Sequence, residues 1–303
     1  TEYGLSDKEI LKQAERRYTQ ALESVKEDFK VCEDVQDFIA GDQWPQGIRS
    51  EREGFNRPCL TLDHLNQYVR HVVNSGLAQE VDIRVMSMNS EGDDATADII
   101  AGIIRQITQT STAQIAYETG LRHECQNGFG FWRVKAMPTG CDHEVTGEPM
   151  HEIGIRRIAD PRMVLMDPFV EYPDGRDARY AFVLTKLSKS DYEDQYGEAK
   201  DGEDISSWHL VDGKDMLPWI GGTSDTVVLA EYYYVMPDGT MCWAILTPSK
   251  VLSKGVHHGD AMPVVRCVGD EFEQDGKQRR RGMIRRGGVV VGPLRVHRWL
   301  NHA

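Results

Sequence analysis

The first forty residues carry apolar positions at the spacing of one helix face. Ser6 followed by Glu9 matches a capping box, which marks a helix start, and Gly41 with Pro45 is typical of a helix end. The pattern predicts a helix from Ser6 to about Ala40 and then a polar surface loop from Gln46 to Asn56. The apolar positions, which recur every three or four residues, are Ile10, Leu11, Ala14, Tyr18, Ala21, Leu22, Val25 and Phe29.

Three further helices are expected before residue 128. One runs from Leu62 to about Leu77 with Thr61 as its cap, and its stripe is Leu62, Leu65, Val69, Val72 and Val73. A second opens at Asp93 and Asp94 and has a wide apolar face formed by Ile99, Ile100, Ile103, Ile104 and Ile107. A polar cluster over 108–112 predicts a break before a third helix, from about Ala113 to Cys125. Between the first two, Val81 to Met86 alternates like a short strand.

From Gly128 the pattern becomes strand-like. The glycines at Gly128 and Gly130 allow close backbone approach beside Phe129, Phe131 and Trp132. Ser188 or Ser190 caps a short helix to about Tyr196, and a loop rich in glycine and aspartate runs from Gly197 to Gly222. Further strands are expected at His151–Ile158, Met163–Met166, Tyr180–Leu187, Thr226–Val235, Met241–Leu246 and Met262–Val268, with a turn at Pro237-Asp238-Gly239. Long N-terminal helices followed by a mixed, mostly antiparallel β region predict an α+β fold.

Composition places the chain among soluble folded proteins. Hydrophobic residues make up 40% and charged residues 27% of the 303 positions, which are ordinary values. No apolar run reaches the ~18–20 residues that span a bilayer, and no basic-then-apolar leader opens the sequence. Six scattered cysteines without a CxxC pair favour reduced thiols over a disulfide framework. An intracellular protein without a membrane segment is therefore expected.

Charge is unevenly distributed along the chain. The first 275 residues carry 27 Lys and Arg against 48 Asp and Glu, whereas residues 276–303 carry eight basic residues and no acidic one. An acidic body repels nucleic acid, because the phosphate backbone is itself anionic. The basic tail has two interpretations, a solvated charge run or a set of phosphate contacts. Its candidate contact residues are Lys277, Arg279, Arg280, Arg281, Arg285 and Arg286.

Nothing in the sequence is typical of a catalytic or cofactor site. Cys141-Asp142-His143-Glu144 and His257-His258-Gly259-Asp260 lie over a hundred residues apart, whereas zinc sites combine closely spaced ligand pairs. The chain has no dinucleotide fingerprint, Walker loop or GxSxG elbow. We expect no enzyme activity, no metal and no cofactor.

The run Tyr232-Tyr233-Tyr234 lies in a predicted strand and has no interleaved basic residue. Tyr232 and Tyr234 should share one face of that strand, and packing in a core is favoured over base stacking.

Several short motifs resemble one family, the portal proteins of short-tailed, headful-packaging tailed bacteriophages. The resemblance covers about residues 1–285 in order and spacing. It is carried by Gly41-Asp42-Gln43-Trp44, Arg57-Pro58-Cys59-Leu60-Thr61, Val69-Arg70-x-Val72-Val73-Asn74, Gly128-Phe129-Gly130-Phe131-Trp132-Arg133-Val134, Asp167-Pro168, Pro173-Asp174-Gly175-Arg176-Asp177-Ala178-Arg179, Ser188-Lys189-Ser190-Asp191, and His258-Gly259-Asp260 ahead of Pro263-Val264-Val265.

The resemblance implies a structural subunit of a homo-oligomeric ring, typically of twelve, at one capsid vertex of the virion. DNA passes through its channel during packaging and ejection. Capsid and scaffolding proteins are implied partners, and ATP hydrolysis belongs to the terminase. The implied parts here are those of the wing, a helical part over 1–127 and a β-rich part over 128–275, with assembly in the host cytoplasm.

The basic tail over 276–303 departs from the family. A long stem helix should follow Gly282-Met283-Ile284-Arg285, but Arg286-Gly287-Gly288-Val289-Val290-Val291-Gly292-Pro293 is incompatible with a helix. We hypothesise that the last eighteen residues come from a shifted frame or a truncated gene, so that terminase and head-completion proteins would bind only if stem and clip were present. The alternative function is a stand-alone DNA-binding or regulatory protein that uses its basic tail.

Overall fold

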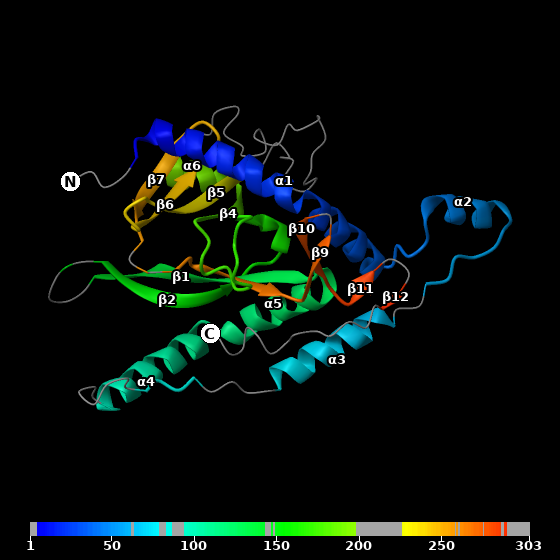
Figure 1. Ribbon diagram of the computed structural model, residues 1–303, viewed down its shortest axis with the longest axis horizontal. Helices are drawn as coiled ribbons and strands as arrows, with labels where there is room; N and C mark the ends of the chain where they lie inside the picture. Colours follow the sequence, from blue (N-terminus) through cyan, green and yellow to red (C-terminus); the bar gives the residue numbers. More distant parts are fainter. Residues whose placement is uncertain are drawn as a thin grey trace. The chain divides into compact units, whose positions relative to one another are not determined.

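Figure 1 shows the computed structural model of the chain. The chain forms two compact units. The structure describes residues 5–61, 64–78, 83–86, 94–142, 147, 149–197, 226–257, 259, 261–274, 276–285 and 288–289. Unit 1 comprises Thr1–Phe29 and Asp160–Pro263, and unit 2 comprises Lys30–Ala159 and Val264–Ala303. Each unit is therefore assembled from two separate stretches of sequence.

Helices come first along the chain and strands afterwards, which confirms the α+β class. The helices before the first strand are α1 (Asp7–Ala40), α2 (Gln46–Gly54), α3 (Leu65–Leu77), α4 (Asp94–Thr110) and α5 (Ala113–Asn127). Then follow β1 (Phe129–Asp142), β2 (Pro149–Arg157), a 3-10 turn (Pro161–Met163), β3 (Val164–Met166), β4 (Tyr180–Ser188), α6 (Lys189–Tyr196), β5 (Thr226–Val235), β6 (Met241–Leu246), β7 (Val251–Val256), β8 (Val264–Val268), β9 (Asp270–Gln274), β10 (Lys277–Arg281), β11 (Ile284–Arg285) and β12 (Gly288–Val289).

The start of α1 follows the predicted capping signal. The backbone N–H of Ser6 donates to the Glu9 carboxylate at 3.0 Å, and its hydroxyl donates to the same oxygen at 2.7 Å. These bonds favour the ionised acid and lower the pKa of Glu9. A backbone donor that no helical carbonyl can reach is thereby satisfied.

Unit 1 is an antiparallel sheet covered by the first part of α1. The strand order is β3-β4-β5-β6-β7. Ile10, Ala14 and Tyr18, spaced by four residues on the helix, are completely buried, and Tyr18 meets the ring of Phe182 edge-on at 5.4 Å. The predicted apolar stripe of α1 therefore faces a core of aromatic strand residues.

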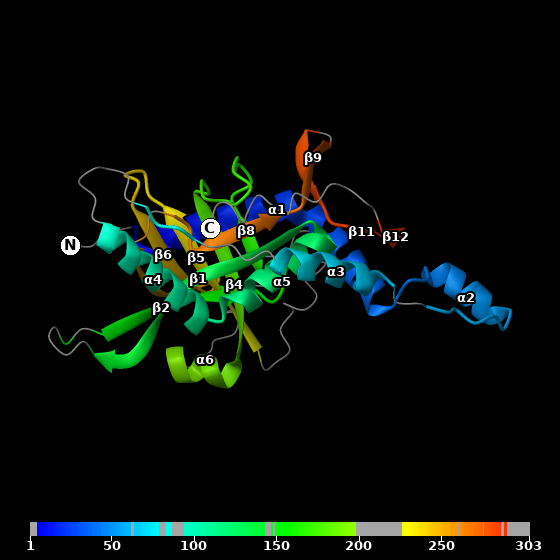
Figure 2. The same cartoon turned by 90° about the horizontal axis from the view of Figure 1, so that it is seen from below.

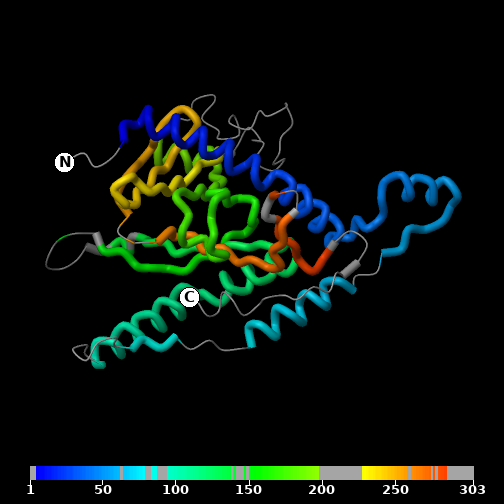
Figure 3. The backbone as a smooth tube through the Cα atoms, in the orientation of Figure 1, coloured from blue at the N-terminus to red at the C-terminus, as the bar shows by residue number. Residues whose placement is uncertain are grey.

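Unit 2 is built on the antiparallel sheet β2-β1-β8, with α5 packed against it. In Figure 3 the segment of β8 runs beside the green tube of β1, although more than a hundred residues separate them in the sequence. Trp132 on β1 is buried with Ala116 of α5 and Cys267 of β8. A second core joins the end of α1, α3, α5 and β11 through Val35, Phe38, Val69, Val73, Leu121, Cys125 and Ile284.

Close backbone contacts explain the glycines at the start of β1. A Cβ on Gly130 would lie 2.2 Å from the carbonyl oxygen of Gly120, and one on Gly128 would lie 2.6 Å from the backbone of Arg281. Gly128 also adopts a left-handed conformation, with φ of 91°. The predicted role of these glycines, close approach of backbone, is confirmed.

Two expectations for the region after α1 are wrong. Gln46 to Gly54 is a helix, α2, rather than a loop, although it lies on the surface and none of its residues is buried. A helix closes its hydrogen bonds locally, so glutamine, arginine and glutamate can form one without a core-facing stripe. Ile83 to Met86 is not a strand, and Val81 lies outside the described residues.

The wide apolar face predicted for α4 is present, but it is only partly covered: Ile104 and Ile107 are half-buried, and the other three isoleucines are exposed. Ala97 and Ala101 are the buried residues of this helix, whereas Ile99, Ile100 and Ile103 are 64%, 43% and 50% exposed. The helix thus packs on its alanines and leaves three large aliphatic side chains open to solvent.

Candidate nucleic-acid interface

The arginine run of the predicted basic tail forms one strand of a β-hairpin. β10 pairs with β9 so that Arg279, Arg280 and Arg281 lie opposite Phe272, Glu271 and Asp270 respectively. Gly276, with φ of 70°, lies in the connecting turn. The sequence pattern does not predict these strands, because β9 is mostly acidic and β10 mostly basic, and neither alternates apolar with polar residues.

Two of the arginines contact acids of the neighbouring strand. Arg281 donates to the Asp270 carboxylate at 2.5 Å, and the Arg280 guanidinium lies 3.4 Å from the carboxylate of Glu271. The Arg281 guanidinium also lies 5.3 Å from the ring centroid of Phe272. Opposite charges facing each other across a ladder stabilise the pairing of the two strands. They also neutralise part of the positive charge that phosphate would require.

The remaining candidate contact residues are only partly placed. Lys277 lies on β10 opposite Gln274, and Arg285 lies on the short strand β11 opposite Gly288. Arg286 lies outside the described residues. The structure therefore brings Lys277, Arg279, Arg280 and Arg281 onto one strand, and contact with nucleic acid stays a prediction.

Glu124 of α5 is a buried acid that the sequence pattern did not indicate. Glu124 is completely inaccessible to solvent, and Asn127, one turn later, is 3% exposed. Neither carboxylate oxygen of Glu124 has a hydrogen-bond partner among the described residues. Burial raises the pKa of Glu124 to about 8, because the charged form loses its hydration. No pattern in the sequence distinguishes this glutamate from the exposed acids around it.

The tyrosine run forms part of a core, as predicted. Tyr232 and Tyr234 are 0% and 2% exposed, and their rings stack at 4.9 Å. Burial raises the pKa of Tyr232 to about 12, and Arg17 of α1 donates to its hydroxyl at 2.7 Å. These rings are therefore occupied in packing and are closed to base stacking.

The two clusters of possible metal ligands, Cys141–Glu144 and His257–Asp260, lie partly outside the described residues. His143, Glu144, His258 and Asp260 are not among them. Among the residues that are described, no three His, Cys, Asp or Glu side chains are grouped as a metal would need. No described helix combines the length and the apolar character needed to cross a bilayer.

These features define an α+β protein with aromatic rings in its cores and an ion-paired β-hairpin. The model of the phage P22-like portal protein family matches residues 15–240. Because this match covers 226 of the 303 residues, the chain belongs to that family. It is a structural portal subunit for DNA packaging, as the motif resemblance implied. The family associates with the capsid as an oligomeric ring at a vertex of the virion.

Proposed function

We propose that the chain is one of twelve copies in a closed portal ring and that its described residues form the wing. The helical part over 1–127 and the β-rich part over 128–275 would contact capsid and scaffolding proteins, and DNA would pass through the central channel. The family match over 226 of 303 residues carries the proposal. Assembly in the host cytoplasm belongs to the same proposal, as does binding of terminase and head-completion proteins where a stem and a clip are present.

The surface properties of the chain support a ring subunit. A protein that forms a channel for DNA must avoid holding it, and a net charge of −13 disfavours contact with phosphate. A mainly structural role also agrees with the large aliphatic side chains that α4 leaves exposed, since contiguous exposed apolar surface marks sites of association. We propose no catalytic step for this chain.

Negative-stain electron microscopy of the purified chain tests the proposal. We expect rings with a central hole and twelvefold symmetry in class averages, together with a matching mass by sedimentation. A chain that stays monomeric at micromolar concentration, alone and with its scaffolding protein, would contradict it. A different but uniform subunit number would correct the number twelve and leave the ring in place.

The alternative of a stand-alone DNA-binding regulator has weaker support. It needs the arginines of β10 to be available to phosphate, but Arg280 and Arg281 each face an acid on β9. Salt-dependent retention on DNA, compared between the full chain and a chain ending at Asp275, separates the two functions. Phosphate contacts predict a steep loss of affinity with salt that the shorter chain lacks.

A further inference from the structure

Residues 42–61, here called the arm, form a projection braced by its own contacts. The indole N–H of Trp44 donates to the carbonyl of Leu60 at 3.2 Å. Arg52 lies over the Trp44 ring at 4.8 Å and donates to the carbonyl of Pro58 at 3.1 Å. The two limbs of the arm are thus tied together from within. None of its residues is buried.

The arm presents large apolar side chains to solvent. Ile48, Phe55 and Leu60 are 47%, 69% and 74% exposed. Ile48 lies on α2 and Phe55 directly follows its last residue. They are seven residues apart, which is two helical turns, so they lie on the same side of the arm. Apolar side chains that project from a chain and are not buried within it are typical of a surface that contacts another molecule.

A second exposed apolar surface lies on α4. Ile99, Ile100 and Ile103, here called the isoleucine face, are spaced by three and four residues and form one stripe. Ala97 and Ala101 attach the other side of the helix to unit 2. Because the helix is already anchored through these alanines, the isoleucine face is available to a partner.

The arm and the isoleucine face lie at opposite ends of unit 2, since α2 and α4 are far apart in both Figure 1 and Figure 2. A closed ring requires a head-to-tail interface between two different surfaces of the same subunit. We propose that the arm of one copy docks on the isoleucine face of the next copy. This inference rests on the proposed function, because it names the contact that closes the ring.

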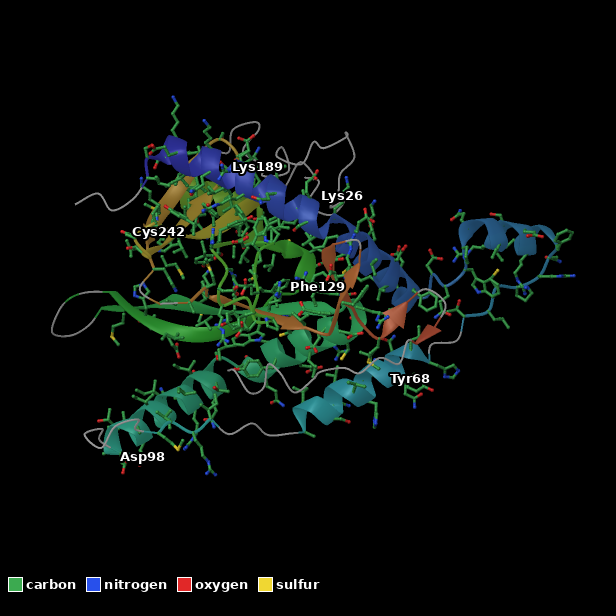
Figure 4. All side chains as sticks on the ribbon, viewed as in Figure 1. Lys26, Tyr68, Asp98, Phe129, Lys189 and Cys242 are labelled. Carbon is green, nitrogen blue, oxygen red and sulfur yellow. The ribbon has the colours of Figure 1, made fainter. Side chains whose placement is uncertain are left out.

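Charge at the two surfaces supports the same pairing. Arg57 is exposed on the arm, and its guanidinium lies 6.0 Å from the ring centroid of Phe55. On α4, Asp94 and Asp98 are exposed one turn apart beside Ile99, and Asp98 is labelled near the end of the helix in Figure 4. Each surface also carries the other sign, since Glu51 is exposed on the arm and Arg105 on α4. Pairing Arg57 with Asp98 and Glu51 with Arg105 would place opposite charges around the apolar contact. Such complementarity favours one register over others.

Single charged substitutions test each surface. Phe55→Glu should remove docking through the arm, and Ile103→Glu should remove docking through the isoleucine face. The matched controls are Ser50→Glu on α2 and Gln109→Glu on α4, both at exposed positions outside the proposed contact. By sedimentation velocity we expect each test variant to weaken association on the order of 100-fold, as for a central interface residue. The controls should assemble like the unmodified chain.

A mixing experiment tests the head-to-tail arrangement. Phe55→Glu chains retain the isoleucine face and Ile103→Glu chains retain the arm, so an equimolar mixture should form one-to-one dimers but no rings. A symmetric contact of arm with arm, or of face with face, predicts no such mixed dimer. Circular dichroism melts of each variant establish that it is folded. Arg57→Asp with Asp98→Arg, a charge exchange, should restore more association than either change alone.

The possible results distinguish failure of the proposed ring from failure of the docking contact. If the unmodified chain forms no oligomer, the proposed ring fails and this inference fails with it. Rings that persist in Phe55→Glu or Ile103→Glu refute the inference and leave the proposed ring in place. A loss of thermal stability in Ile103→Glu without any oligomer to lose would show that another part of the same chain covers the face, which also refutes it.

Discussion

Tyr232 of β5 stacks on Phe182 of β4, with 4.5 Å between their ring centroids and 17° between their planes. The two residues are direct partners across the antiparallel ladder. Tyr18 of α1 meets Phe182 edge-on from the helix side, and all three side chains are completely buried. This cluster is therefore where α1 attaches to the sheet of unit 1.

Removing the central ring of this cluster should destabilise unit 1 strongly. We expect Phe182→Ala to lower the free energy of unfolding by about 3–5 kcal/mol, because it leaves a cavity among rings that cannot collapse. Urea unfolding followed by circular dichroism measures the change. Tyr233→Phe is the control, since Tyr233 lies on the opposite side of β5 and loses only a hydroxyl that bonds Glu231. Equal losses in both variants would contradict the role assigned to the cluster.

Stability should depend on pH through Glu124. Its pKa is raised to about 8 in the folded chain, whereas an unfolded glutamate titrates near 4.3. The folded state therefore binds the proton more tightly, and the stabilisation is complete below the unfolded pKa and is lost as pH rises through about 8. In that window the loss is ~1.4 kcal/mol per pH unit.

Glu124→Gln keeps the shape of the protonated acid and removes its titration. We expect the melting temperature of this variant to exceed that of the unmodified chain increasingly from pH 5 to pH 8.5. Glu118→Gln, on the same helix but ion-paired with Arg122 near the surface, should show no such divergence. Parallel pH profiles for Glu124→Gln and the unmodified chain would mean that Glu124 is ionised in the fold.

Glycine positions offer a pair of substitutions with opposite expected signs. Gly130→Ala would place a Cβ 2.2 Å from the carbonyl oxygen of Gly120, so β1 and α5 would have to separate. We expect a loss of several kcal/mol, on the order of 3 kcal/mol or more, by analogy with overpacked cores. Gly102→Ala on α4 meets nothing within 4 Å and should stabilise by about 1 kcal/mol. Thermal melts of both variants measure the difference.

The hairpin acids should limit binding to DNA. Asp270→Asn with Glu271→Gln releases Arg281 and Arg280 from their ion pairs. If the prediction of phosphate contact is right, this double variant binds duplex DNA more tightly at low salt. The slope of log affinity against log salt should steepen by about 0.9 for each additional phosphate that the arginines neutralise. Glu15→Gln with Glu23→Gln on α1 removes the same charge elsewhere, and an equal increase in affinity there would refute a specific role for the hairpin.

Much of the helical architecture was predictable because its signals are local. The capping residues Ser6 and Ser188 mark the starts of α1 and α6 in the structure. The predicted break between α4 and α5 is present, and Thr112 there adopts a left-handed backbone conformation. Helix α2 was missed for the complementary reason. None of its nine residues is buried. Hydrophobic periodicity indicates a helix face that contacts a core, so it gives no signal for this helix.

The candidate surfaces were less predictable, because sequence does not reveal what covers a side chain. The spacing of Ile99, Ile100 and Ile103 predicted an apolar face but not its exposure. The arginines of β10 were visible as a charge run, whereas their pairing with Asp270 and Glu271 depends on a strand register that no apolar alternation marks. Glu124 is one acid among 48 Asp and Glu, and only the fold distinguishes it.

Ile284 of β11, 2% exposed, packs in the same core as Val35 and Phe38 of α1, and the backbone N–H of Met283 donates to the carbonyl of Cys125. Because Ile284 follows Val35 by 249 residues, this core of unit 2 cannot close until that whole stretch has left the ribosome. By then the intervening stretch of unit 1 has already emerged. Pairings of such long sequence separation form slowly, and their apolar surfaces stay open to other chains meanwhile. The timing of synthesis thus provides an interval in which a chaperone or a scaffold could capture the nascent subunit.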